Sequence, residues 1–306
     1  QELDFIVRLV DQVTGPAAGI AAEFQNITGA AENSYRQMAY GAAGLVGSAV
    51  VLQQTLQPAI EMNKALGEVE SLGVMDDALV ELKNTALDFS VDFGESATDF
   101  IGSAYDIQSA IAGLNSAELS AFTKSSNILA KATKSDAGTI TDYMGTMYGI
   151  FEKNALAMGK AEWVNQVAGQ TAAAVQMFKT TGGEMASAFS SVGAEAQSNG
   201  VAMAEQMAVM GQLQATMSGA EAGTKYKAFL GGVGKAQEEL GLSFTDSHGQ
   251  LLPILNILDL LKGKFGESFS VAESVDLKKA FGSAEAVGMI KLLMANTEGL
   301  NQNIQT

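Results

Sequence analysis

Apolar residues recur at intervals of three and four along most of this chain, which is the spacing of one face of an α-helix. Phe100, Ala104, Ile107 and Ile111 form one such series. The 306 residues include only 3 Pro, so few positions are barred from a helix interior. The sequence therefore predicts an all-α fold, with helices of about 12–22 residues arranged as helical hairpins or as an elongated bundle.

Glycine and asparagine divide the helical pattern. Turns are expected at Gly182-Gly183, at Asn199-Gly200 and at Asp246–Gly249. Before the first helix, the alternation of apolar residues in Leu3–Val13 predicts one short β-strand. Pro16 then opens the first predicted helix.

Three regions are expected. Residues 1–58 hold the strand and small-residue apolar helices, residues 59–300 form the main helical region, and residues 301–306 are a polar tail. Because the chain starts without an initiator Met and stops in polar residues, we expect a fragment of a longer protein.

The most apolar stretch is Met38–Leu52, which contains no charged residue. Gly41, Gly44 and Gly47 give it a small-residue face that suits close contact between helices. At 15 residues it is shorter than the ~20 that a membrane-spanning helix needs. Two interpretations stay open: a buried or oligomer-facing helix, and a segment that enters a membrane at some stage.

A stripe of methionines marks the helix near residue 210. It comprises Met203, Met207, Met210, Leu213 and Met217. Such a stripe fits a protein core, because Met fills irregular gaps, and it also fits an adaptable groove for a partner.

Composition excludes several function classes. The chain carries 18 Lys and Arg against 34 Asp and Glu, a formal net charge of −16, whereas specific nucleic-acid binding requires basic surfaces. It has no Cys and a single His, His248, which removes thiolate chemistry and His-rich metal sites. No catalytic, cofactor or metal site is predicted, and we expect a protein that is not an enzyme and needs no cofactor.

Two local patterns imitate functional motifs. Gly231–Ala236 contains a Gly-Lys pair, but a phosphate loop needs Gly at position 229, where this chain has Phe, and a hydroxyl residue at position 236. We interpret these glycines as helix-packing positions. His248 lies beside Asp246 and Ser247 in a glycine turn, where local hydrogen bonding explains the residue types.

Several segments resemble, in their order, the conserved region of phage tail tape measure proteins. The strongest are Gly219–Lys227, Asp246–Leu251 and Lys279–Ala286, preceded by Ala59–Met62, Val69–Leu72 and Ser190–Ala196. The positions that match the family motifs are Ala222, Gly223, Thr224, Asp246, Gly249, Leu251, Phe281 and Gly282. The resemblance covers residues 59–300 well and the first 58 residues loosely.

The resemblance implies a structural role in the virion tail of an infectious phage, a prophage or a phage-derived particle. Such a protein occupies the lumen of the tail tube in several copies, sets tail length, and leaves when the particle delivers its contents. Its expected partners are copies of itself, the tail tube protein, baseplate or tip hub proteins and tail assembly chaperones. It would be made in the cytoplasm of the bacterial host. The alternative is a membrane-active helical protein that inserts through residues 38–52, and transient membrane contact is compatible with both.

Overall fold

The computed structural model describes residues 45–305, with side chains from residue 57 onward. The described part is helical throughout, and its one β-contact is an isolated antiparallel bridge between Thr245 and Leu251. The helices are α2 Leu45–Glu70, α3 Asp76–Phe93, α4 Ala97–Ala110, α5 Ser116–Ala132, α6 Ala137–Met158, α7 Lys160–Phe178, α8 Gly182–Val192, α9 Glu195–Ser198, α10 Met203–Gln214, α11 Gly219–Leu240, α12 Ile254–Phe265, α13 Val271–Phe281, α14 Ala284–Met294 and α15 Thr297–Gln305. Two compact units divide the chain between Ile128 and Leu129, inside α5.

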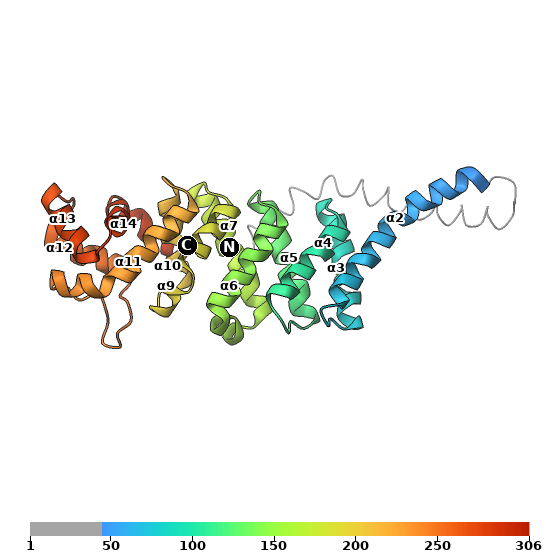
Figure 1. The fold of residues 1–306 in the computed structure, drawn as a ribbon, viewed down its shortest axis with the longest axis horizontal. Coiled ribbons are helices and arrows are strands. Elements are labelled where there is room, and N and C mark those ends of the chain that lie inside the picture. Colours follow the sequence, from blue (N-terminus) through green and yellow to red (C-terminus); the bar gives the residue numbers. More distant parts are fainter. Residues whose placement is uncertain (1–44, 306) are drawn as a thin grey trace. The chain divides into compact units, whose positions relative to one another are not determined.

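The first unit packs α3 and α4 as an antiparallel hairpin, with α2 against both (Figure 1). Gly94 ends α3 with a φ of 69°, and Ser96 begins α4 by accepting a hydrogen bond from the Asp99 backbone. The core is aromatic at this corner, where the Phe89 ring lies 4.6 Å from Phe93 and 4.9 Å from Phe100.

The second unit is organised around α10 and α11. Helix α10 is buried almost on every side, and it contacts α7, α8, α11, α14 and α15. Helix α11 contacts α8 most extensively and also packs on α13 and α14, as its orange ribbon shows (Figure 1). Long-range packing therefore concentrates on two neighbouring helices.

The all-α prediction is confirmed for the described residues. The predicted N-terminal strand at Leu3–Val13 lies outside them. Helix lengths extend beyond the predicted range, because α2 has 26 residues and continues through Pro58, while α9 has 4. The expected division at residue 58 thus falls inside α2, and most of the predicted polar tail is the end of α15.

Two local features shape α5 and α10. Asn115 and Glu118 exchange backbone and side-chain hydrogen bonds of 2.9 Å at the start of α5, which is a capping box. The methionine stripe serves the core, since Met207 and Met210 are buried. Its outer members, Met203 and Met217, are partly exposed.

Candidate functional site

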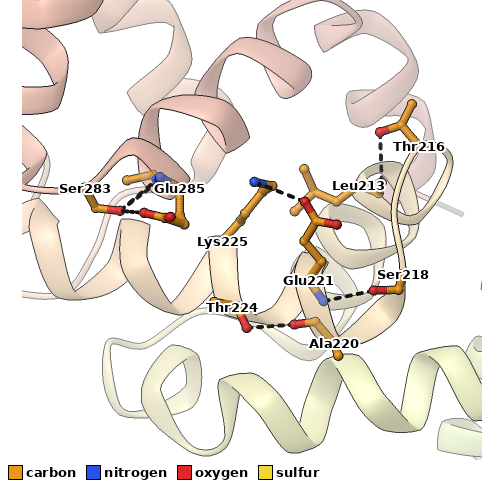
Figure 2. Close-up of polar contacts among 10 residues, drawn as sticks. Leu213, Thr216, Ser218, Ala220, Glu221, Thr224, Lys225, Ser283 and Glu285 are labelled. Atoms are coloured by element: carbon orange, nitrogen blue, oxygen red, sulfur yellow. Dashed lines mark hydrogen bonds and ion pairs between the residues drawn. The ribbon is translucent and has the colours of Figure 1, made fainter.

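The residues that match the family motifs lie on α11 and on two segments close to it in sequence or space. Ser218 begins α11 by accepting a hydrogen bond from the Glu221 backbone at 3.3 Å (Figure 2). The Gly219 backbone then donates to the Glu184 carboxylate at the start of α8. These contacts fix where α11 begins and hold that end on α8.

Glycines allow the backbones of α11 and α8 to approach closely. A β-carbon at Gly219 would collide with the Glu184 carbonyl oxygen, and one at Gly223 would collide with the Ala188 carbonyl oxygen. Ala222, the next motif position, is fully buried. The Gly-x-x-x-Gly spacing places both glycines on one helix face, so this interface requires residues without side chains.

Thr224 and Lys225 belong to the polar side of the same turn. The Thr224 hydroxyl donates to the Ala220 carbonyl oxygen at 2.8 Å and is exposed. The Lys225 ammonium lies 3.3 Å from the Glu221 carboxylate (Figure 2).

Lys225 also faces α14. A β-carbon at Gly288 would lie 3.6 Å from the Lys225 ammonium, so the lysine passes close to the α14 backbone. Its charge helps to lower the pKa of Glu285, although the hydrogen bond from the Ser283 hydroxyl is the larger cause. The lysine thereby links the start of α11 to the start of α14. Its side chain lies close to the α14 backbone, and its positive charge acts on Glu285.

Phe281 occupies the middle of a second contact, between α11 and α13. Its ring stacks on Phe229 at 5.5 Å and on Phe244 at 6.2 Å. The backbone of Gly232 lies against the Phe281 carbonyl, and Gly282 then ends α13 with a φ of 73°. The motif pair Phe-Gly therefore anchors and terminates α13 on α11.

Asp246, Gly249 and Leu251 form a tight turn between α11 and α12. The Asp246 carboxylate accepts hydrogen bonds from the Gln250 backbone at 2.9 Å and the His248 backbone at 2.8 Å, and these bonds lower its pKa. Gly249 has a φ of 78°, which favours glycine. The Leu251 backbone donates at 3.1 Å to the Asn199 carbonyl oxygen.

His248 is an exposed member of this turn. Its ring lies 3.8 Å from the Asp246 carboxylate and 3.4 Å from the Ser247 hydroxyl. All of these contacts are between near neighbours in sequence. The arrangement is the local turn chemistry that the sequence indicates.

One buried carboxylate was not anticipated from the sequence. Glu205 of α10 is 9% exposed, and its Oε1 accepts a hydrogen bond of 3.0 Å from the Ile254 backbone at the start of α12. Burial raises the pKa of Glu205, against the opposing effect of this hydrogen bond. Tyr226 is also fully buried, and its pKa is raised by burial and by the negative field of Glu205. The only available signal was an acidic residue inside the methionine stripe.

The other singled-out glycines differ in their surroundings. In the Gly231–Ala236 pattern, all positions lie inside α11, where Gly232 is packed and Gly231 and Gly234 face open space. Gly41 and Gly44 lie outside the described residues, and Gly47 lies in the first turn of α2.

No helix between residues 45 and 305 combines the length and apolarity needed to cross a membrane. Across the same residues, no group of three or more His, Asp or Glu side chains is placed to hold a metal ion.

Over residues 45–305 these contacts define an all-helical fold, in which the motif residues close-pack, cap and terminate helices around α11. A family model described as "Phage-related minor tail protein" matches residues 83–282, which include all eight motif positions. The chain belongs to the phage-related minor tail protein family. This membership assigns it a structural role in the phage tail, in association with other tail components. No curated protein and no solved structure matches the chain.

Proposed function

We propose that this chain is the conserved helical region of a tail tape measure protein. The full-length protein of this kind occupies the lumen of the tail tube, sets tail length and supports assembly of the tube on the baseplate or tip. It leaves the tube when the particle delivers its contents. The observation that carries the proposal is the family match over residues 83–282, together with the motif positions gathered on and around α11.

The packing of the second unit supports a narrow structure. Gly219, Gly223 and Gly232 bring backbones of neighbouring helices into direct contact, which reduces the distance between helix axes. Aromatic residues make up only 7% of the chain, so few side chains widen the helices. Thin helices suit a confined space such as a tube lumen.

The described residues form compact units rather than one extended helix. Buried side chains from helices far apart in sequence, such as Phe229 and Phe281, pack together. A folded hairpin covers far less length than the 1.5 Å per residue of a continuous helix. We therefore assign to these units the anchoring or nucleating part of the task, and the length-setting rod to residues outside them.

The proposed partners are further copies of the chain, the tail tube protein, baseplate or tip hub proteins and tail assembly chaperones. The role is non-enzymatic. Specific nucleic-acid binding is not part of it, because a net charge of −16 repels phosphate and would let DNA pass without adhering.

Deleting the α3–α4 hairpin, Asp76–Ala110, in the parent gene tests this proposal. Electron microscopy would count tails and measure their length. An anchoring unit predicts fewer tails with unchanged length, whereas a rod predicts tails shortened by about 50 Å, at 1.5 Å per residue. Tails of normal number and normal length after removal of residues 59–300 would disprove the tape measure assignment.

A further inference from the structure

Helix α3 presents an apolar stripe to solvent. Val80, Leu87 and Val91 are 60%, 36% and 40% exposed. Their spacing of seven and four residues places them on one helix face, along about 16 Å of the helix. The opposite face, with Leu82, Ala86 and Phe89, is buried in the first unit. We refer to Val80, Leu87 and Val91 as the α3 stripe.

Carboxylates follow one edge of the α3 stripe. Asp77, Glu81, Asp88 and Asp92 are all exposed, and no ion pair within residues 57–305 involves them. In the sequence from residue 61 to 118, the only basic residues are Lys64 and Lys83. An occupant of the stripe must therefore be apolar at its centre and basic at its edge.

Helix α13 carries a face of that kind. Val271 and Val275 are 85% and 61% exposed, and they lie one turn apart. Lys278 and Lys279 continue the same exposed side toward the end of the helix. Lys235 of α11 adds a third ammonium group here, since it donates at 3.0 Å to the Lys279 carbonyl oxygen. We refer to Val271, Val275, Lys278 and Lys279 as the α13 face.

We propose that the α3 stripe of one copy docks on the α13 face of a second copy. This inference rests on the proposed function, in which several copies share one tube, and it names the surfaces through which they meet. Apolar contact between the valines and Leu87 supplies the attraction, and the opposite charges fix partner and register. The two surfaces differ, so the contact is heterologous. Each pair of copies therefore still has one α3 stripe and one α13 face free to bind further copies.

Residues 1–44 offer a poorer occupant for the α3 stripe. Residues 1–44 contain Arg8 and Arg36 but more acidic residues, namely Glu2, Asp4, Asp11, Glu23 and Glu32. Pairing of the stripe with itself brings together two surfaces of the same negative charge, so it lacks the charge complementarity that the α13 face supplies. Only three side chains of the α3 stripe and four of the α13 face form the centre of this contact, so we expect it to be weak between free copies. Confinement of the copies in one tube would strengthen it by raising their effective concentration.

Cysteine cross-linking tests the contact without background, because the natural chain has no Cys. A chain with Val91→Cys is mixed with a differently tagged chain with Val275→Cys and mildly oxidised. We expect several-fold more disulfide-linked heterodimer than from Leu156→Cys mixed with Val275→Cys. Leu156 lies on α6 and is 60% exposed, against 40% for Val91, so exposure alone would favour the control mixture. Circular dichroism of each variant confirms that it remains folded. Equal yields from the two mixtures would overturn the proposal.

Charge reversal tests the pairing itself in the same assay. D88K/D92K in the Val91→Cys chain should abolish the excess heterodimer, and K278E/K279E in the Val275→Cys chain should do the same. Mixing the two reversed chains restores opposite charges and should restore the cross-link.

Three results would refute the pairing. The first is a cross-link whose yield does not change on charge reversal. The second is a cross-link that is not restored when both reversed chains are mixed. The third is a cross-link that, in a chain carrying both cysteines, forms only within one chain and never between two. Because this assay uses purified chain, its failure would leave the tail-length experiment and the proposed function standing.

Discussion

Gly232 of α11 lies directly against the backbone carbonyl of Phe281 at the end of α13. A β-carbon at this glycine would lie 2.5 Å from that carbonyl oxygen, which is closer than such atoms approach. The neighbouring glycines Gly231 and Gly234, on the same helix, have no atom within 4 Å of the equivalent position. One glycine of the three therefore determines how closely α13 can pack.

Gly232→Ala should destabilise the second unit. The added methyl group forces α13 away from α11, and overpacking of this kind costs about 1–3 kcal/mol. Urea unfolding followed by circular dichroism measures the change. Gly234→Ala is the matched control, because it adds a methyl group in open space and gains up to about 1 kcal/mol of helix propensity. Equal effects of the two substitutions would show that the close contact is not limiting.

The glycines also show which structural features could be predicted from the sequence and which could not. Helix spacing, the Ser96 cap and the Asn115 capping box depend on residues within a few positions of one another, so they were predictable. The sequence does not show that Gly232 is packed and Gly231 is not, because that difference depends on where Phe281 lies in the folded chain. The motif order located the residues around α11 but not their contacts, since those contacts join helices distant in the chain.

Glu205 was missed for the same reason. Its partner is the backbone of Ile254 at the start of α12, which is 49 residues away. The sequence around Glu205 does not indicate that α12 begins beside it. An acidic residue in a methionine-rich helix could equally have marked a solvent-exposed edge. Burial and the helix start are properties of the tertiary structure alone.

Glu205→Gln should remove a pH dependence of stability. Burial raises the pKa of Glu205 in the folded state above its usual value of 4.5. The protonated form is therefore favoured by folding, and its stabilising contribution is lost as pH rises through the folded pKa. Gln retains the oxygen that accepts from Ile254 but carries no charge.

Urea unfolding between pH 4 and pH 8 provides the measurement for Glu205. We expect the natural chain to lose stability across the raised pKa, and the Gln variant to lose less. Glu221→Gln is the control, because Glu221 is an exposed carboxylate on α11. If the natural chain and Glu205→Gln had parallel pH profiles, the buried carboxylate would not be the cause.

Asp246 should show the opposite pH dependence. Hydrogen bonds from the Gln250 and His248 backbones lower its pKa, so its contribution to stability is present above the unfolded pKa and lost as pH falls through the folded pKa. Asp246→Ala should loosen the turn at neutral pH, and its effect should shrink as pH falls through the folded pKa and the carboxylate becomes protonated. Amide hydrogen exchange at Gln250 and Leu251 follows this turn directly. Ser247→Ala is the nearby control, and faster exchange in it alone would contradict the assignment.

Phe281→Ala should be the most damaging single substitution of the motif residues. The ring stacks on both Phe229 and Phe244, and removing a buried Phe side chain costs about 3–5 kcal/mol. Phe281→Leu retains most of the apolar volume and should cost clearly less, which separates packing from any specific role of the ring. Differential scanning calorimetry of the purified chain measures both variants. If Phe281→Ala left the transition unchanged, the aromatic cluster would not hold α13 on α11, and the close approach at Gly232 would have to do so by itself.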